Sequence, residues 1–150
     1  MEVAETVGQH WFFKSFTPEE LKLLLAKGQQ VFFPAGSKIL QEGKPAESFY
    51  ILLAGAVSIK IIRQEHEEFI LSTLKHPGEI FGWSTLVEEG RFTATAECLE
   101  DCRLISFKRK DLEDFFAEHP QLGYQFMRSL ARLISRRLES TRALLFKEIS

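Results

Sequence analysis

Asparagine is absent from this chain of 150 residues, and cysteine, tryptophan and tyrosine each occur only twice. Cys98 and Cys102 are too few for a disulfide scaffold, and they supply half of the thiolates that usually hold an iron–sulfur cluster. We therefore expect both to be reduced thiols that are buried or half-buried. Because asparagine is missing, glycine has to make the turns that need a left-handed backbone.

The sequence also lacks an excess of one charge and a long hydrophobic run. Its net charge is −2, so it has no basic surplus for duplex DNA, and we expect no direct nucleic-acid binding. The longest apolar stretch, residues 49–57, is far shorter than the roughly 20 residues that cross a bilayer. The first residues lack the basic start of a signal peptide. We therefore expect a cytoplasmic protein that does not contact membranes.

What is present indicates one folded domain. Hydrophobic residues make up 45% of the chain and charged residues 27%, which excludes a disordered or fibrous protein. A length of 150 residues suits a single domain with its own core, and we assign residues 1–150 to it. Phenylalanine occurs 14 times, which predicts an aromatic core.

A helix start is visible near the N-terminus. Thr17 suits the N-cap, Pro18 the first helical position, and Glu20 completes a capping box with Thr17. Gly28 is placed to end this helix in a left-handed conformation.

Residues 31–107 predict a mainly β fold. Short runs of valine, isoleucine, phenylalanine and threonine alternate there with glycine and proline, as expected for an antiparallel barrel or sandwich. The charged segment Glu65-His66-Glu67-Glu68 fits a solvated hairpin turn better than a metal site.

Two helices are expected after the β region. The first covers about 110–118 and is stopped by Pro120, which can also open a long C-terminal helix over about 120–147. The long helix has a heptad seam that could pair with a second copy, made of Met127, Ala131, Ile134, Leu138, Thr141 and Leu145. A second apolar face should pack on the same chain: Phe126, Leu130, Leu133 and Leu144. The alternative is one wide stripe buried within a monomer.

No enzyme signature is complete. The segment Gly82-Trp83-Ser84-Thr85-Leu86 breaks the nucleophile elbow at its last glycine, and no two histidines flank one residue as in metal-dependent barrels. Cys98 and Cys102, if they lie on one strand, are about 13 Å apart and cannot share a metal. We expect neither an enzyme nor a metal site. Residues 79–96 combine glycine with hydroxylated residues and could present backbone N–H groups to an anion, although such turns are usually structural.

The order of these parts resembles the cyclic nucleotide-binding domain of bacterial regulators related to the cyclic AMP receptor protein and FNR. Residues 33–43 are similar to the first turn and strand of that family, and residues 49–59 to its next hairpin, with Gly55 in the turn. Residues 77–82 and 93–95 look like the two ends of its phosphate-binding cassette. The resemblance covers essentially the whole chain and implies an antiparallel, jelly-roll-like β-roll, with a long helix that forms a homodimer.

The cassette departs from the family pattern at two positions. Trp83 stands where an acidic residue would accept the ribose hydroxyl, and Phe92 stands where an arginine would bind the cyclic phosphate. Loss of that bidentate contact should cost on the order of 2 to 3 kcal/mol, roughly two decades of affinity. Arg91 lies one residue early, and strand alternation points it to the opposite face. We therefore expect a collapsed or repurposed pocket rather than an ordinary cyclic AMP site.

The resemblance implies a regulatory domain that senses a small molecule and changes how its C-terminal helix packs. The site residues that it implies are Phe81, Gly82, Trp83, Ser84, Thr85, Leu86, Arg91, Phe92, Thr93, Ala94, Thr95 and Thr141. Thr141 could contact a base or limit the register of the dimer. Cyclic AMP, cyclic GMP and, with His10 as axial ligand, haem are the cofactors considered. A haem-based gas sensor and a ligand-free dimerisation module remain alternatives. The winged helix-turn-helix domain of the family is not expected within this chain.

Overall fold

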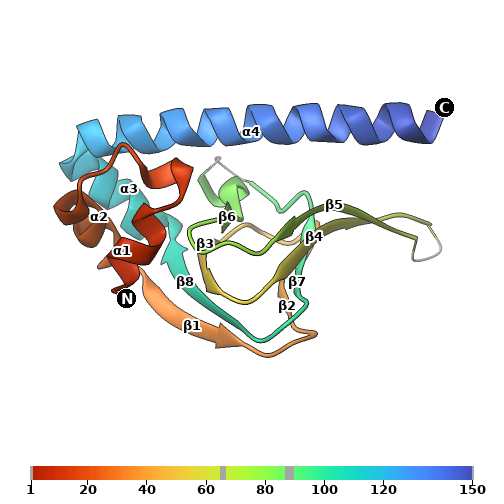
Figure 1. Ribbon diagram of the computed structural model, residues 1–150, viewed down its shortest axis with the longest axis horizontal. Coiled ribbons are helices and arrows are strands. Elements are labelled where there is room, and N and C mark those ends of the chain that lie inside the picture. Colours follow the sequence, from red (N-terminus) through yellow and green to blue (C-terminus); the bar gives the residue numbers. More distant parts are fainter. Residues whose placement is uncertain (1, 65–66, 87–89, 150) are drawn as a thin grey trace.

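The computed structural model describes residues 2–64, 67–86 and 90–149 (Figure 1). Its helical elements are α1 (Val3–Gly8), η1 (Trp11–Phe13), α2 (Pro18–Leu25), η3 (Trp83–Leu86), α3 (Arg109–Glu118) and α4 (Pro120–Ile149). Its strands are β1 (Gln29–Phe33), β2 (Lys38–Leu40), β3 (Ser48–Ala54), β4 (Val57–Ile62), β5 (Glu68–Leu74), β6 (Ile80–Phe81), β7 (Thr95–Cys98) and β8 (Cys102–Lys108). The predicted order of helix, β region, short helix and long helix is confirmed, whereas α1 and η1 are additions that the sequence did not signal. Glu65 and His66 of the expected hairpin turn lie outside the described residues.

The strands form two antiparallel sheets, as a β-roll requires. One sheet has the order β1-β8-β3-β6 and the other β2-β7-β4-β5. Strands distant in the sequence are therefore neighbours, with Phe49 of β3 opposite Phe107 of β8. An apolar cluster that includes Leu52, Val57 and Leu104 is fully buried in the roll. This jelly-roll-like arrangement confirms the predicted fold class.

The connection between β3 and β4 requires glycine at position 55. The φ angle of Gly55 is +105°, which side-chain-bearing residues rarely adopt. A Cβ atom there would also lie 2.5 Å from the carbonyl oxygen of Asp101. The turn and its close approach to the β7–β8 connection therefore both explain this glycine.

Helix α2 begins as predicted but ends differently. The Thr17 hydroxyl accepts from the Glu20 amide at 3.1 Å, and the Glu20 carboxylate accepts from the Thr17 amide at 2.9 Å, which completes the capping box. The prediction for Gly28 is wrong, because the helix ends at Leu25 and Gly28 is not among the positive-φ glycines. A Cβ atom at Gly28 would lie 2.4 Å from Ile105 Cγ2, so close packing against β8 explains this glycine.

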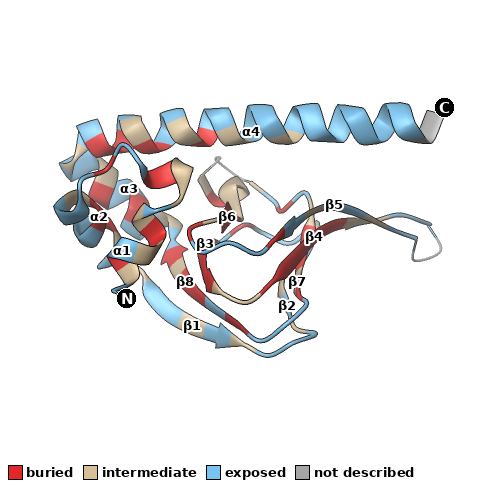
Figure 2. Ribbon diagram, viewed as in Figure 1, coloured by how far each residue is buried: buried red, intermediate tan, exposed pale blue. Residues whose placement is uncertain are grey.

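The helices enclose an aromatic core, as the phenylalanine content predicted. The ring centroid of Phe126 on α4 lies 5.2 Å from that of Phe12 and 5.5 Å from that of Phe49. Each of these side chains is at most 1% exposed. Helix η1 is therefore held between α4 and the roll, and α4 is anchored by its N-terminal half (Figure 2).

The two faces of α4 differ as the sequence predicted, with one exception. Phe126 and Leu130 are buried and Leu133 is half-buried against the same chain, but Leu144 is 41% exposed, so its predicted contact is wrong. Leu144 belongs to the C-terminal part of α4, where residues 138–147 are all exposed and therefore pack against no other part of the described chain. All members of the predicted seam are exposed: Met127, Ala131, Ile134, Leu138, Thr141 and Leu145. A single stripe buried within one chain is therefore excluded. Among the described residues, no helix has the length and apolarity needed to span a membrane.

Candidate functional site

A small pocket lies between the roll, η3 and α4, at the place where the cassette was predicted. Its lining residues are Leu40, Ile59, Phe81, Gly82, Trp83, Ser84, Phe92, Thr93, Ala94 and Arg137. Its volume is about 50 Å³, whereas pockets for drug-sized ligands measure about 300–1,000 Å³. The described pocket is therefore nearly filled by its own side chains.

Phe92 is one of the large apolar side chains that line the pocket. Its side chain is 9% exposed and belongs to the apolar cluster within the roll. Its amide donates to the Lys44 carbonyl at 3.0 Å, and its carbonyl accepts from the Gly43 amide at 2.8 Å. These two hydrogen bonds fix the backbone at Phe92, and packing within the apolar cluster holds its ring.

Arg91 does not supply the positive charge that an arginine at position 92 would bring to the pocket. The Arg91 side chain is exposed, and its guanidinium donates to the Gly43 carbonyl at 2.8 Å. It is not among the residues that line the pocket. The loop at Gly43 and Pro45, which pairs with Arg91, therefore holds this cation on the outer side of the roll.

Two threonines of the predicted cassette have structural partners instead. The Thr85 hydroxyl donates to the Ser48 carbonyl at 2.7 Å, and the Thr95 hydroxyl accepts from the Glu42 amide at 3.0 Å. Both side chains are buried. Leu86 packs against the aromatic core between the helices. These three residues brace the cassette and do not line its pocket.

Thr141 also lies away from the pocket lining. Its exposed hydroxyl donates to the Arg137 carbonyl at 2.9 Å, one helical turn earlier. The structure thus brings together seven of the predicted residues: Phe81, Gly82, Trp83, Ser84, Phe92, Thr93 and Ala94. Thr85, Leu86, Arg91, Thr95 and Thr141 are outside that group.

Arg137 is the pocket residue that the sequence analysis missed. Its guanidinium Cζ lies 5.3 Å from the centre of the Trp83 ring, and it is the one charged side chain of the described pocket lining. Burial lowers the pKa of Arg137 from its usual value, while Glu79 acts in the opposite direction. Arg137 lies four residues, about one helical turn, before Thr141. Because Thr141 was a predicted site residue, this spacing was a signal that could have identified Arg137.

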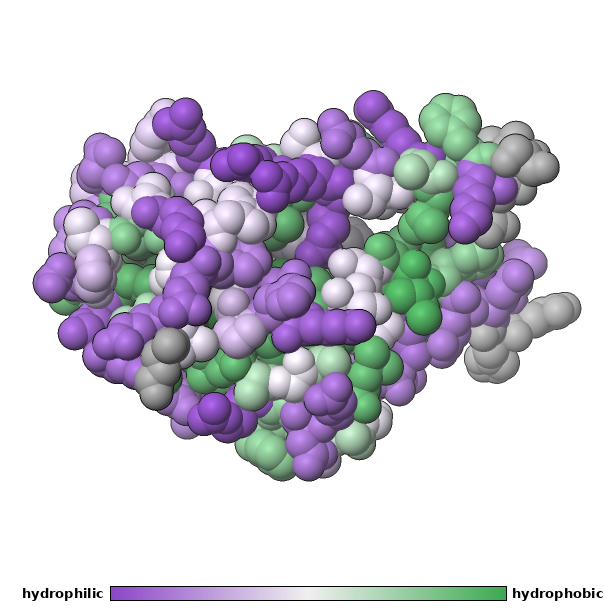
Figure 3. All heavy atoms as spheres, in the orientation of Figure 1, coloured by the Kyte–Doolittle hydropathy of each residue, from purple (hydrophilic) through white to green (hydrophobic). Residues whose placement is uncertain are grey.

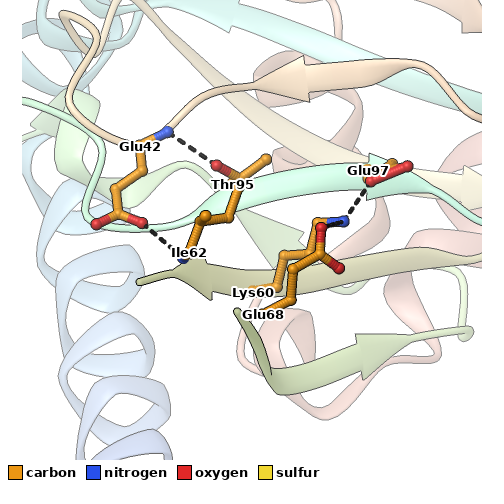
Figure 4. Close-up of polar contacts among 6 residues, drawn as sticks. All are labelled: Glu42, Lys60, Ile62, Glu68, Thr95 and Glu97. Atoms are coloured by element: carbon orange, nitrogen blue, oxygen red, sulfur yellow. Dashed lines mark hydrogen bonds and ion pairs between the residues drawn. The ribbon is translucent and has the colours of Figure 1, made fainter. Parts of the chain in front are cut away.

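Lys60 and three carboxylates of the roll are paired within it (Figure 4). Lys60 of β4 is 7% exposed and donates to Glu68 of β5 at 3.0 Å and to Glu97 of β7. The hydrogen bond to Glu97 is the largest of the effects that raise the pKa of Lys60. The Glu42 carboxylate accepts from the Ile62 amide at 3.2 Å. These contacts tie neighbouring strands together, and no carboxylate appears in the described lining of the pocket.

The cysteines are buried thiols, as expected, but the predicted separation on one strand is wrong. Cys98 ends β7 and Cys102 begins β8, so the chain turns between them and brings the two thiols into contact. Burial, together with the neighbouring Cys102, raises the pKa of Cys98 to about 12. Among the described residues, no group of three potential metal ligands comes together.

His10 has a structural role in this fold. Its Nδ1 accepts from the Phe12 amide at 3.2 Å and so caps η1. Its ring lies 5.7 Å from that of Trp11, centroid to centroid. The geometry therefore provides a reason for His10 that does not involve haem.

Comparison with known proteins identifies what the chain is similar to. The model of the cyclic nucleotide-binding domain matches residues 30–119. A CRP-like cAMP-activated global transcriptional regulator of Mycobacterium tuberculosis is 28% identical over 145 residues, which are 97% of this chain and 64% of that protein. The cyclic AMP receptor protein of Thermus thermophilus is 31% identical over 84% of this chain and 56% of that protein. The crystal structure of Thermus thermophilus catabolite activator protein superimposes with a TM-score of 0.77 at 30% identity, covering 89% of this chain and 61% of that one. This chain thus spans less than two thirds of these relatives.

Proposed function

Since the chain belongs to the cyclic nucleotide-binding domain family, we propose that it is a sensor domain whose small-molecule effector changes how α4 packs in a homodimer. The relatives are named as transcriptional regulators, and we extend a regulatory role to this chain. The contact between Trp83 of the cassette and Arg137 of α4 carries the proposal.

That contact supports a direct link between pocket and helix. A ligand in so small a pocket would contact Trp83, Phe92 or Arg137, because all three side chains line it. Arg137 belongs to the same helix as the seam residues Leu138 and Thr141. A displacement of Arg137 would therefore act on the adjoining part of the seam.

The pocket favours an effector other than cyclic AMP at ordinary affinity. Among the described residues, the cassette contributes no cation to the pocket lining, and Phe92 stands where the family pattern has the phosphate-binding arginine. The available groups are one guanidinium from α4, the hydroxyls of Ser84 and Thr93, and apolar walls. This set suits a compact ligand with one anionic group and an apolar body, which would have to move Trp83 or Phe92 to be accommodated.

The exposed seam supports the homodimer. Ile134 is 41% exposed and Leu138 is 52% exposed in the single chain, at heptad spacing. A second copy with the same seam would cover them in an isologous interface. A ligand-free dimerisation module is the second candidate, and the small volume of the pocket is the observation that favours it.

Native mass spectrometry combined with thermal unfolding tests the proposal. We expect a dimer that carries one small molecule per chain, released on denaturation, and at most weak thermal stabilisation by cyclic AMP or cyclic GMP. A ligand at 100 times its Kd would add about 2.7 kcal/mol to the free energy of unfolding. A dimer without any bound molecule would favour the dimerisation module, and a monomer at high micromolar concentration would overturn both candidates.

A further inference from the structure

A second hollow lies outside the roll, between η1 and the first half of α4. It has a volume of about 400 Å³ and is lined by residues of both elements and of the connection after η1. We call it the α4–η1 hollow. Its charged lining residues are Lys14, Arg128 and Arg132, and no acidic residue is part of the described lining.

The positive charges of the α4–η1 hollow have no counter-ions within the part of the chain that the structure describes. Among the described residues, no carboxylate lies within ion-pair distance of Lys14, Arg128 or Arg132. The cation of Arg132 instead lies over the ring of Trp11 at 5.2 Å, beside Arg136 at 4.3 Å. The net charge of the chain is −2, so this is a local concentration of positive charge and not a general property.

Three arginines of α4 repel one another along the helix, and the fold does not relieve this repulsion with a described counter-ion. Arg128, Arg132 and Arg136 follow one another at four-residue intervals, so like charges face each other along the helix and destabilise it. A dianion placed between the guanidiniums would turn this repulsion into charge-assisted hydrogen bonding. Hydrophilic side chains gather along this part of α4, whereas hydrophobic ones lie near its far end (Figure 3).

The hollow also contains a buried hydrogen-bond acceptor that needs a donor. The Gln125 side chain is part of the lining, and its Oε1 is buried without a hydrogen-bond donor among the described residues. The lining also includes three residues that carry hydroxyl groups, Ser15, Ser129 and Tyr124. An anion that also carries hydroxyl groups could serve both the cations and the unpaired acceptor.

The proposed dimer seam adjoins one side of the α4–η1 hollow, because Tyr124 of its lining lies one heptad before Ala131 of the seam, whereas Arg132 lies farther round the helix. At 100° per residue, Arg132 lies about 140° around α4 from Met127 of the seam. The hollow also lies on a different side of α4 from the pocket that contains Arg137. Its occupation does not depend on the proposed function.

From these charges, their spacing and the unpaired acceptor, we propose that the α4–η1 hollow binds a small, hydroxyl-bearing phosphate ester with at least two negative charges. Its recognition would combine Lys14, Arg128 and Arg132 with the hydroxyls of the rim.

Isothermal titration of the whole chain with inorganic pyrophosphate, followed by glucose 6-phosphate, tests this proposal. We expect one site per chain for both probes, weakened when ionic strength is raised from about 50 mM to about 300 mM. The double variant Lys14→Gln/Arg128→Gln leaves both stacking arginines on Trp11 and should weaken binding at least about tenfold. The matched control Lys27→Gln/Arg142→Gln removes two exposed cations elsewhere and should bind as the wild type does.

Three results would overturn the proposal. One is no measurable heat with either probe at about 10 mM, far above the Kd expected of two charge-assisted contacts. Another is an equal loss of affinity in the control variant, which would indicate general charge attraction. The third is saturable binding of polyglutamate without binding of either phosphate probe, which would assign the hollow to an acidic protein segment. Melting temperatures of both variants within a few degrees of wild type would show that the comparison is between folded proteins.

Discussion

Arg137 of α4 lies over the indole ring of Trp83, with its Cζ 5.3 Å from the ring centre. The contact joins the long helix to η3, which follows β6, and both side chains line the small pocket between the roll, η3 and α4, called the roll pocket below. Arg136, its neighbour in the chain, lies 4.3 Å over Trp11. Both tryptophans of the protein therefore receive an arginine from α4, which fixes the helix on two sides.

A double-mutant cycle measures the first of these contacts. Arg137→Gln and Trp83→Ala should each reduce the free energy of unfolding, and the pair should show a coupling energy of about 0.5–1 kcal/mol, because a partly exposed cation–π contact is lost only once. Urea denaturation of the four proteins gives the values. Strict additivity would mean that the two side chains do not stabilise one another.

Phe92→Ala should enlarge the roll pocket at a large cost in stability. Since the ring is 9% exposed, we expect a loss of about 3 kcal/mol in the free energy of unfolding. The matched control is Phe32→Ala, whose ring is 61% exposed and whose loss should stay within about 0.5 kcal/mol. Similar losses in both variants, measured in urea, would contradict the buried placement of Phe92.

His10 should make the fold less stable in mild acid. Burial lowers its pKa below the usual 6.5, so between the two pKa values the unfolded chain binds a proton that the folded chain excludes. Its contribution to stability is therefore full above pH 6.5 and declines as the pH falls through the folded pKa. His10→Asn keeps a capping oxygen for η1 and should flatten the dependence of melting temperature on pH. An unchanged pH dependence would contradict this role.

The two cysteines should be unreactive in the native protein. A thiol with a pKa of about 12 is ionised to about one part in ten thousand at pH 8, and only the thiolate attacks a disulfide reagent. We expect no rapid colour with Ellman's reagent from the folded chain and two equivalents after unfolding in urea, since the sequence has two cysteines. Cys98→Ser should leave Cys102 equally protected. Rapid labelling of the native chain would show that the β7–β8 connection is open.

The sequence predicted well the features that depend on residues close together in the chain. The capping box of Thr17 and Glu20 involves neighbouring residues, and the glycine-punctuated runs describe strands without fixing their partners. The helices α1 and η1 were missed because their stability comes from packing, as the contact of Phe12 with Phe126 illustrates. Gly28 was assigned to backbone freedom because its neighbours Ile105 and Phe107 lie on a distant strand.

In the candidate site, too, residue types were predicted from the sequence, whereas contacts between distant segments were not. The residue types at positions 83 and 92 indicated a pocket without its usual charges, and the structure places both side chains in the pocket lining. Arg137 was missed because its role depends on which face of α4 turns toward η3. The distance between Cys98 and Cys102 was misjudged because one strand was assumed where the chain reverses direction.

The central claim is that the roll pocket and the dimer seam are coupled through α4. Sedimentation equilibrium of the wild type and of Trp83→Ala tests it without a ligand, with Phe32→Ala as the control. We expect the wild type to dimerise and Trp83→Ala to change the dimer dissociation constant by at least about fivefold, while Phe32→Ala stays within about twofold of wild type. A dissociation constant that is the same in all three proteins, or a wild type that remains monomeric, would contradict the account.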